Sequence, residues 1–345
     1  MTTSTDAPSG SHFRVRDLRS GGFAFVMATA IVATSILNSG AHILAEVMFV
    51  IANVTYLILI GDIVVRFVRR RAPIETGFMT LTFAAACGVL GAHHALVGHR
   101  VPALVLVIAG LAAWAVLGYT VAARVVTGLG DLTGLERVDG TWFLWAVATQ
   151  SVAVSCGAYA THFSAPALAT LAALCWSVGL VQFILIASIV FARLALIHVK
   201  PEEPVSPYWI FMGCAAITIL AGAEILGLRT EQSLLETHVV ATVSMILWSF
   251  ATWLIPLLVG LFIWQQRRAT TRFRFQTPWW SMVFPIGMYG ESSRQLGRIR
   301  GTDWLENVGQ WESWIALAVW AAACAMAVRR LIAERHRARP LESLG

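Results

Sequence analysis

Some ionisable residues of this sequence fall inside long apolar stretches, where charged side chains are rare, and three of them stand out. They are Glu224, Glu291 and Arg294. A charge within a membrane-type apolar span is costly to keep, and such residues often serve an ion path or a proton relay. The sequence contains no HExxH, GxSxG or GxxxxGK[ST] motif. We therefore expect no enzyme, no ATP-driven pump, no cofactor and no metal site.

The composition indicates a membrane protein that crosses the bilayer many times. Charged residues make up 13% of the 345 residues and hydrophobic residues 57%, with a mean hydropathy of +0.71. A soluble surface cannot be built from so few charges, because soluble proteins carry about 25%. The net charge of +6 comes almost entirely from arginine, in short clusters between apolar runs. Such clusters are typical of topology control, so we expect no nucleic-acid partner.

Ten apolar runs are long enough to cross a bilayer, which needs about 20 residues per helix. They lie at 22–39, 42–66, 75–97, 101–123, 141–160, 165–192, 207–228, 237–264, 278–297 and 309–328. We therefore expect an all-α integral membrane protein with one transmembrane domain at 21–333, between tails at 1–20 and 334–345. The first run resembles a signal peptide, but residues 42–66 are again apolar, so we take it as the first membrane helix.

The arginine distribution predicts the orientation of these spans. If both termini are cytoplasmic, 20 of the 25 basic residues lie on the cytoplasmic side. That split satisfies the positive-inside rule. The arginine-rich composition, with a single lysine, and the short tails fit the plasma membrane of a bacterium.

The odd-numbered spans differ from the even-numbered ones. Even spans are long and rich in Leu, Ile, Val and Trp, whereas odd spans are richer in Gly, Ala, Ser and Thr. Small and hydroxyl side chains suit close helix contacts or a watery path, and bulky aliphatic ones suit lipid. The pattern predicts five helical hairpins, each with an inner odd helix and an outer even helix. Tight packing without any path remains the alternative.

A proline interrupts the ninth span. Pro285 removes a backbone donor and clashes with the preceding turn, so we expect a kink beside Phe284. At 100° per residue, Phe284, Met288, Glu291 and Gln295 share one helix face. The sequence therefore predicts an aromatic ring and a carboxylate along the same line of this helix.

Four segments resemble a known family of transporters. PWWSMVFPIGMYG (278–290) looks like the ninth-helix signature of the tellurite-resistance/dicarboxylate transporter family, which includes plant slow anion channels and fungal malate permeases. The similarity extends to FVMATAIV (25–32), GTWFLWAVATQ (140–150) and PYWIFMGCAA (207–216).

The resemblance implies a central pore between five hairpins, a homotrimer with one pore per subunit, and a phenylalanine that plugs the pore. By motif position that gate is Phe284. The pore-lining positions that we expect on the odd helices are Met27, Thr29, Thr149, Gly213, Pro285, Gly287 and Met288.

The charged residues leave three interpretations open for Glu291. It pairs with Arg294 or Arg298, or it is protonated and couples proton movement to transport, or it lies in the outer headgroup zone without a role. Glu224 has the same three interpretations and a less obvious partner. A carrier of dicarboxylates needs a fixed cation in its path, for which Arg294 is the candidate.

Transport of small anions such as chloride or nitrate, through a channel or uniporter gated by an aromatic side chain, is the function that we expect. The alternative is a proton-coupled or gradient-driven carrier of C4-dicarboxylate, sulfite or tellurite-type oxyanions. The expected partners are these anions, the lipid bilayer and two further copies of the chain.

Overall fold

The computed structural model describes residues 17–69, 77–128, 134–228, 234–268 and 279–338, and its described elements are all helical. Most of the tails predicted at 1–20 and 334–345 lies outside the described residues. The ten α-helices are α1 (Asp17–Asn38), α2 (His42–Val68), α3 (Thr82–Leu96), α4 (Arg100–Thr127), α5 (Leu144–Phe163), α6 (Pro166–Leu196), α7 (Trp209–Leu226), α8 (Thr237–Arg268), α9 (Trp280–Arg300) and α10 (Asp303–Ala338).

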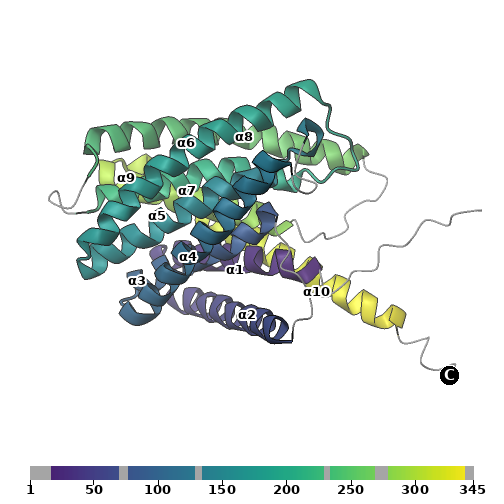
Figure 1. The fold of residues 1–345 in the computed structure, drawn as a ribbon, viewed down its shortest axis with the longest axis horizontal. Helices are drawn as coiled ribbons and strands as arrows, with labels where there is room; N and C mark the ends of the chain where they lie inside the picture. Colours follow the sequence, from purple (N-terminus) through teal and green to yellow (C-terminus); the bar gives the residue numbers. More distant parts are fainter. Residues whose placement is uncertain (1–16, 70–76, 129–133, 229–233, 269–278, 339–345) are drawn as a thin grey trace, which may run out of the picture.

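Short 3-10 helices precede three of the odd-numbered helices. They are η1 (Phe78–Leu81) before α3, η3 (Gly140–Phe143) before α5 and η4 (Ser206–Tyr208) before α7; η2 (Leu135–Arg137) follows α4. At η3, the carboxylate of Asp139 accepts a hydrogen bond of 2.8 Å from the Thr141 backbone N–H and caps the turn. These turns extend the inner helices at the end of the bundle where α1 begins and α10 ends (Figure 1).

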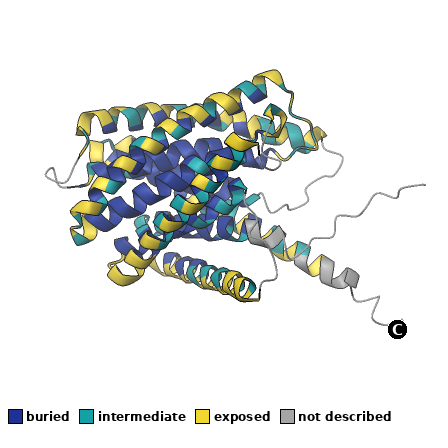
Figure 2. Cartoon of the chain, in the orientation of Figure 1, coloured by how far each residue is buried: buried dark blue, intermediate teal, exposed yellow. Residues whose placement is uncertain are grey.

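The helices form two layers, and the alternation predicted from the sequence is confirmed. In the spanning windows of α1, α3, α5 and α7, 72–94% of the residues are buried, whereas in α2, α4, α6, α8 and α10 the share is 17–33%. Figure 2 shows the buried helices at the centre and the exposed faces on the outer helices. The exposed faces are apolar, with side chains such as Ile43, Leu57 and Phe191. Such faces suit contact with lipid chains.

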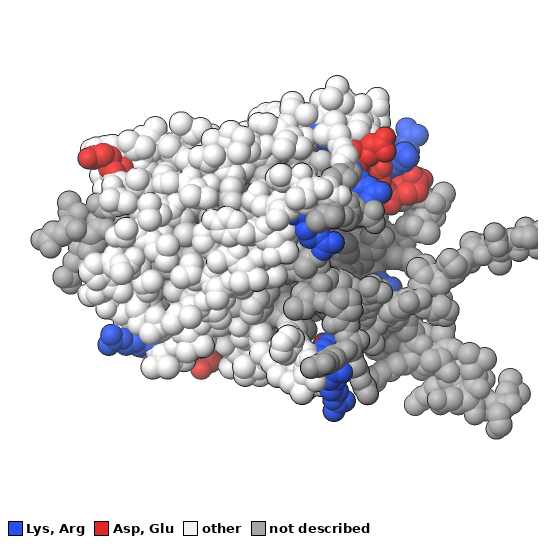
Figure 3. All heavy atoms as spheres, viewed as in Figure 1, with Lys and Arg blue, Asp and Glu red and all other residues white. Residues whose placement is uncertain are grey.

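Charged atoms gather at the two ends of the molecule in Figure 3, and a wide uncharged band separates them. Nine of the described helices are long and apolar enough to cross a membrane. The ninth span of the sequence prediction, now α9, is not among them, since it carries Glu291, Arg294, Arg298 and Arg300. The predicted count of ten spans is therefore not confirmed by composition, although α9 is buried between α1, α7 and α10.

A glycine turn folds α9 back onto α10. Gly301 has φ +61°, a left-handed conformation that side chains with a Cβ rarely adopt. The Thr302 N–H donates to the Gly297 carbonyl at 2.8 Å, and the Gly301 N–H donates to the Arg298 carbonyl at 3.2 Å. This Schellman arrangement satisfies the last carbonyls of α9 and sets the direction of α10.

A second glycine lets α7 and α9 approach at the level of Phe284. A Cβ on Gly213 would lie 2.8 Å from Cγ of Pro285, which is closer than atoms of this type come in proteins. The proline ring is rigid, so it cannot move aside as a flexible side chain would. The missing donor of Pro285 does not end α9, which continues through this position from Trp280 to Arg300.

We predict that Gly213→Ala destabilises the protein, because the added methyl group overlaps the Pro285 ring; overpacking of this kind costs about 1–3 kcal/mol. Gly61→Ala is the matched control, since Gly61 lies on the exposed face of α2 with no atom within 4 Å of its would-be Cβ. Thermal unfolding in detergent measures both. An equal, small effect of the two substitutions would contradict the close contact.

Candidate functional site

A cavity opens between the inner helices at the end of the bundle where they terminate. Its volume, counted as the space open to the centre of a water molecule, is about 40 Å³. Every residue of its wall comes from an odd-numbered helix. The wall consists of Ile31, Thr34 and Asn38 of α1; Val89, Ala92 and Leu96 of α3; Val154, Ala158 and His162 of α5; Leu220 and Glu224 of α7; and Met288, Glu291 and Gln295 of α9.

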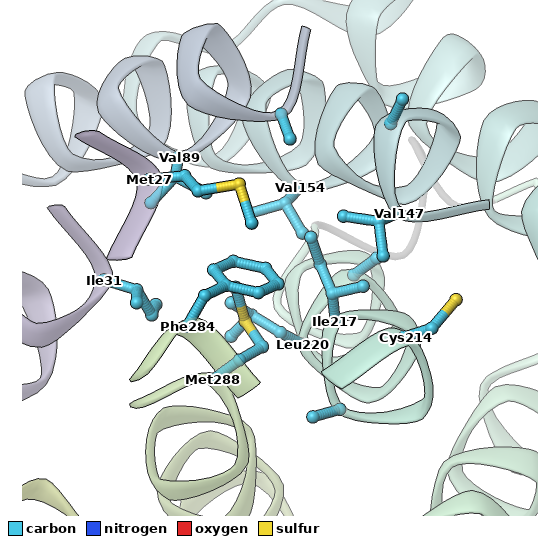
Figure 4. Packing of buried hydrophobic residues seen from close by; sticks show 14 of the residues in the cluster. Met27, Ile31, Val89, Val147, Val154, Cys214, Ile217, Leu220, Phe284 and Met288 are labelled. Carbon is cyan, nitrogen blue, oxygen red and sulfur yellow. The ribbon is translucent and has the colours of Figure 1, made fainter. Parts of the chain in front are cut away.

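Part of this cavity wall also surrounds the ring of Phe284. The ring is completely buried. Figure 4 shows it in the middle of side chains from all five inner helices. We call these residues the Phe284 collar: Met27, Ile31, Val89, Val154, Ile217, Leu220 and Met288. Five of the seven also belong to the cavity wall, so the collar and the cavity share Ile31, Val89, Val154, Leu220 and Met288.

The side chain of Glu291 is held at the cavity wall by two amides. Its Oε1 accepts hydrogen bonds from Asn38 Nδ2 at 2.7 Å and from Gln295 Nε2 at 2.9 Å. Its Oε2 has no hydrogen-bond partner and lies 3.9 Å from Nη1 of Arg294. Only 1% of the residue is exposed. Glu291 is therefore a buried carboxylate with a long ion-pair contact and one oxygen that no donor satisfies.

Arg294 lies on another side of α9, away from the cavity wall. Its Nη1 donates to the Ser35 carbonyl at 2.9 Å, and its Nη2 donates to Ser39 Oγ at 2.7 Å and Ser313 Oγ at 2.8 Å. The guanidinium thus joins α9 to α1 and α10. In this position it does not supply the cation in the path that a dicarboxylate carrier was expected to need.

Glu224 belongs to the part of the cavity wall that α7 supplies. A Cβ on Gly157 would lie 2.8 Å from its Cβ, so a glycine on α5 makes room for the stem of this glutamate. No hydrogen bond or ion pair reaches its carboxylate from the described residues. Of the three charged candidates, Glu224 and Glu291 share the cavity and Arg294 does not.

The two threonines predicted to line the pore point to outer helices instead. Thr29 Oγ1 accepts a hydrogen bond of 2.9 Å from Trp320 Nε1 on α10. Thr149 Oγ1 accepts one of 2.8 Å from Trp114 Nε1 on α4 and donates to Gln182 Oε1 on α6 at 2.7 Å. Both hydroxyls thus bind inner helices to outer ones, and that Thr29 and Thr149 line the path stays a prediction.

The remaining predicted positions lie around the Phe284 ring. Met27 and Met288 point toward it in Figure 4. Gly213 and Pro285 form the contact between α7 and α9, and Gly287 packs against Ile31 of α1. These glycines thus permit close packing and add no polar surface to the path.

Several wall residues were not singled out from the sequence. Asn38 and His162 face the cavity, but each occurs near the end of a span and was indistinguishable from an interfacial polar residue. The spacing of Asn38 could have indicated its position, because Ile31, Thr34 and Asn38 lie on one face of a helix. Within the described ranges, no three His, Cys, Asp or Glu residues are grouped as metal ligands.

Comparison with known proteins identifies the family. The family described as voltage-dependent anion channel matches residues 18–328, which is most of the chain and all of its inner helices. The chain belongs to the voltage-dependent anion channel family. The resemblance that the sequence motifs suggested is thereby confirmed.

Two relatives of this family member are named as a membrane protein and as a transporter. An uncharacterized membrane protein of Mycobacterium tuberculosis, found in strains CDC 1551 and H37Rv, is 39% identical over 139 residues, which are 40% of this chain and 71% of the relative. An uncharacterized transporter of Methanocaldococcus jannaschii is 21% identical over 145 residues, which are 42% of this chain and 41% of the relative. Family and relatives together support anion transport across a membrane as the general activity.

We predict that Arg294→Gln strongly destabilises this family member. The substitution removes the three hydrogen bonds to α1 and α10 and leaves Glu291 without its cation; breaking a buried pair in this way costs about 3–5 kcal/mol. Arg298→Gln is the control, because its ion pair with Glu306 is exposed and such pairs contribute about 0–1 kcal/mol. Unfolding temperatures in detergent measure the difference. Equal shifts for the two variants would show that Arg294 is not a structural cation.

Proposed function

We propose that this chain conducts small monovalent anions, such as chloride or nitrate, along the axis of its five inner helices, with Phe284 as the barrier. The observation that carries the proposal is the cavity: its wall is drawn only from the inner helices, and it ends on the collar around the Phe284 ring. A path that enters the bundle and stops at one side chain supports a plugged pore better than a solid helical core.

The barrier at the collar follows from hydration. An anion keeps its water shell unless polar groups replace it, and the Phe284 collar consists of aliphatic and thioether groups around the Phe284 ring. The buried ring therefore blocks hydrated ions. A change in the side-chain torsion of one phenylalanine opens the barrier without moving any helix.

The opposite end of the path favours anions. There α3, α5 and α7 begin, through the turns η1, η3 and η4, and η3 contacts both η1 and η4. Helix N-termini carry partial positive charge and unpaired N–H groups. Together with the arginine excess predicted for this side, they attract an anion without binding it tightly enough to slow its release.

The orientation of Arg294 bears on the substrate. Carriers of C4-dicarboxylate, sulfite or tellurite-type oxyanions, proton-coupled or driven by a gradient, are the alternative function. Divalent substrates favour a fixed cation in the path, whereas Arg294 binds Ser35, Ser39 and Ser313. That arrangement supports monovalent anions. We further propose a bacterial plasma membrane location with cytoplasmic termini, and assembly as a homotrimer.

We predict that Phe284→Ala increases chloride and nitrate flux in proteoliposomes well above that of the wild type, because it removes the ring that closes the path. Phe183→Ala is the matched control, since Phe183 is also buried but lies on the outer helix α6. Malate and sulfite are tested in parallel.

Two results would decide against the proposal. Absence of flux for every anion in correctly folded Phe284→Ala protein would refute a plugged pore. Malate or sulfite flux that requires a gradient, in the absence of chloride and nitrate flux, would favour the carrier.

A further inference from the structure

The cavity presents an electrostatic problem for an anion path. Glu224 and Glu291 both belong to its wall, and the charge of Glu291 acts on Glu224. The cavity also lies at the C-terminal ends of the inner helices, which carry partial negative charge. An anion that moves through the cavity therefore passes close to negative groups.

The known contacts neutralise only one of the two carboxylates. Glu291 has Arg294 at 3.9 Å and amide donors at one oxygen, but its Oε2 is buried and receives no hydrogen bond. Glu224 has neither a cation nor a donor among the described residues. One negative charge thus remains in the cavity when both glutamates are ionised.

Among the described residues, no cation other than Arg294 forms an ion pair with Glu224 or Glu291. Arg298 is exposed and paired with Glu306 at 2.8 Å. On α5, the Nδ1 of His162 lies 2.9 Å from the Ala158 carbonyl, and on α3, the Nδ1 of His93 lies 2.7 Å from Thr34 Oγ1. Neither imidazole is hydrogen-bonded to Glu224 or Glu291.

We infer that the cavity is a proton-binding site, in which Glu224 together with the unsatisfied oxygen of Glu291 holds one proton when the path conducts. This inference rests on the proposed function and adds its regulation. With the proton, the cavity is neutral overall, since Arg294 balances the second carboxylate. Without it, the remaining charge repels anions at the cavity end.

The direction of the pH dependence follows from this charge balance. Lowering the pH on the cavity side protonates the pair, removes the repulsion and raises anion flux. Raising the pH ionises Glu224 and lowers flux. With the Phe284 ring in place, only the cavity side is effective, because the ring separates this side from the opposite end.

The test compares two variants. The parent carries Phe284→Ala alone, which provides measurable flux, and the second carries Phe284→Ala together with Glu224→Gln. Glutamine keeps the size of the side chain and removes its charge. Between about pH 8 and about pH 5 on the cavity side, nitrate flux of the parent should rise roughly tenfold, as expected for removal of one charge several ångströms from the ion. At the high pH, nitrate flux through the variant that also carries Glu224→Gln should equal the nitrate flux of the parent at the low pH.

Glu46→Gln is the matched control, because Glu46 is an exposed carboxylate on α2. It should retain the pH profile of the parent. A sodium-free series separates proton binding from binding of a metal cation.

The outcomes distinguish a failure of the proposed anion conduction from a failure of the proton site. Absence of nitrate flux in Phe284→Ala at any pH overturns the proposed function, and this inference with it. Flux that is independent of pH, or that keeps its pH profile in Glu224→Gln, overturns the proton site alone. Flux that depends on sodium instead of pH also overturns it.

Discussion

Close packing of five inner helices around one aromatic ring is the constraint on which the rest of the structure depends. These helices are shielded from lipid by the outer ones, so their contacts rely on small residues and tight van der Waals packing. Gly213 admits the Pro285 ring, and Gly157 admits the stem of Glu224. The same contacts that hold the helices together therefore place Phe284 on the axis and a carboxylate on the cavity wall.

The charged groups of α9 are compatible with this packing because each has a defined position. Arg294 is buried and donates to α1 and α10, which replaces part of the hydration that it loses. Glu291 faces the cavity one turn before it and is held by Asn38 and Gln295. A helix too polar to meet the composition of a membrane span is thus stable as an inner helix.

Most of the architecture could be predicted from the sequence, because it follows from composition along whole helices. The alternation of small and bulky residues predicted the two layers, and 278–290 indicated the family. Individual side-chain directions could not be predicted in the same way. The hydroxyl groups of Thr29 and Thr149 favoured a position along a watery path, yet each accepts a hydrogen bond from a tryptophan of an outer helix. The meeting of Glu224 with Glu291 depends on the rotation of α7 relative to α9, which no local pattern determines.

The central claim is that the Phe284 ring separates the cavity from the rest of the path. The most direct measurement is cysteine accessibility, in a chain whose five native cysteines are replaced, for two collar residues: Leu220→Cys, which lines the cavity, and Met27→Cys, which does not. A membrane-impermeant thiol reagent added on the cavity side should label Leu220→Cys, and should label Met27→Cys only when Phe284 is also replaced by alanine. Equal labelling of Met27→Cys with and without the ring would contradict the account.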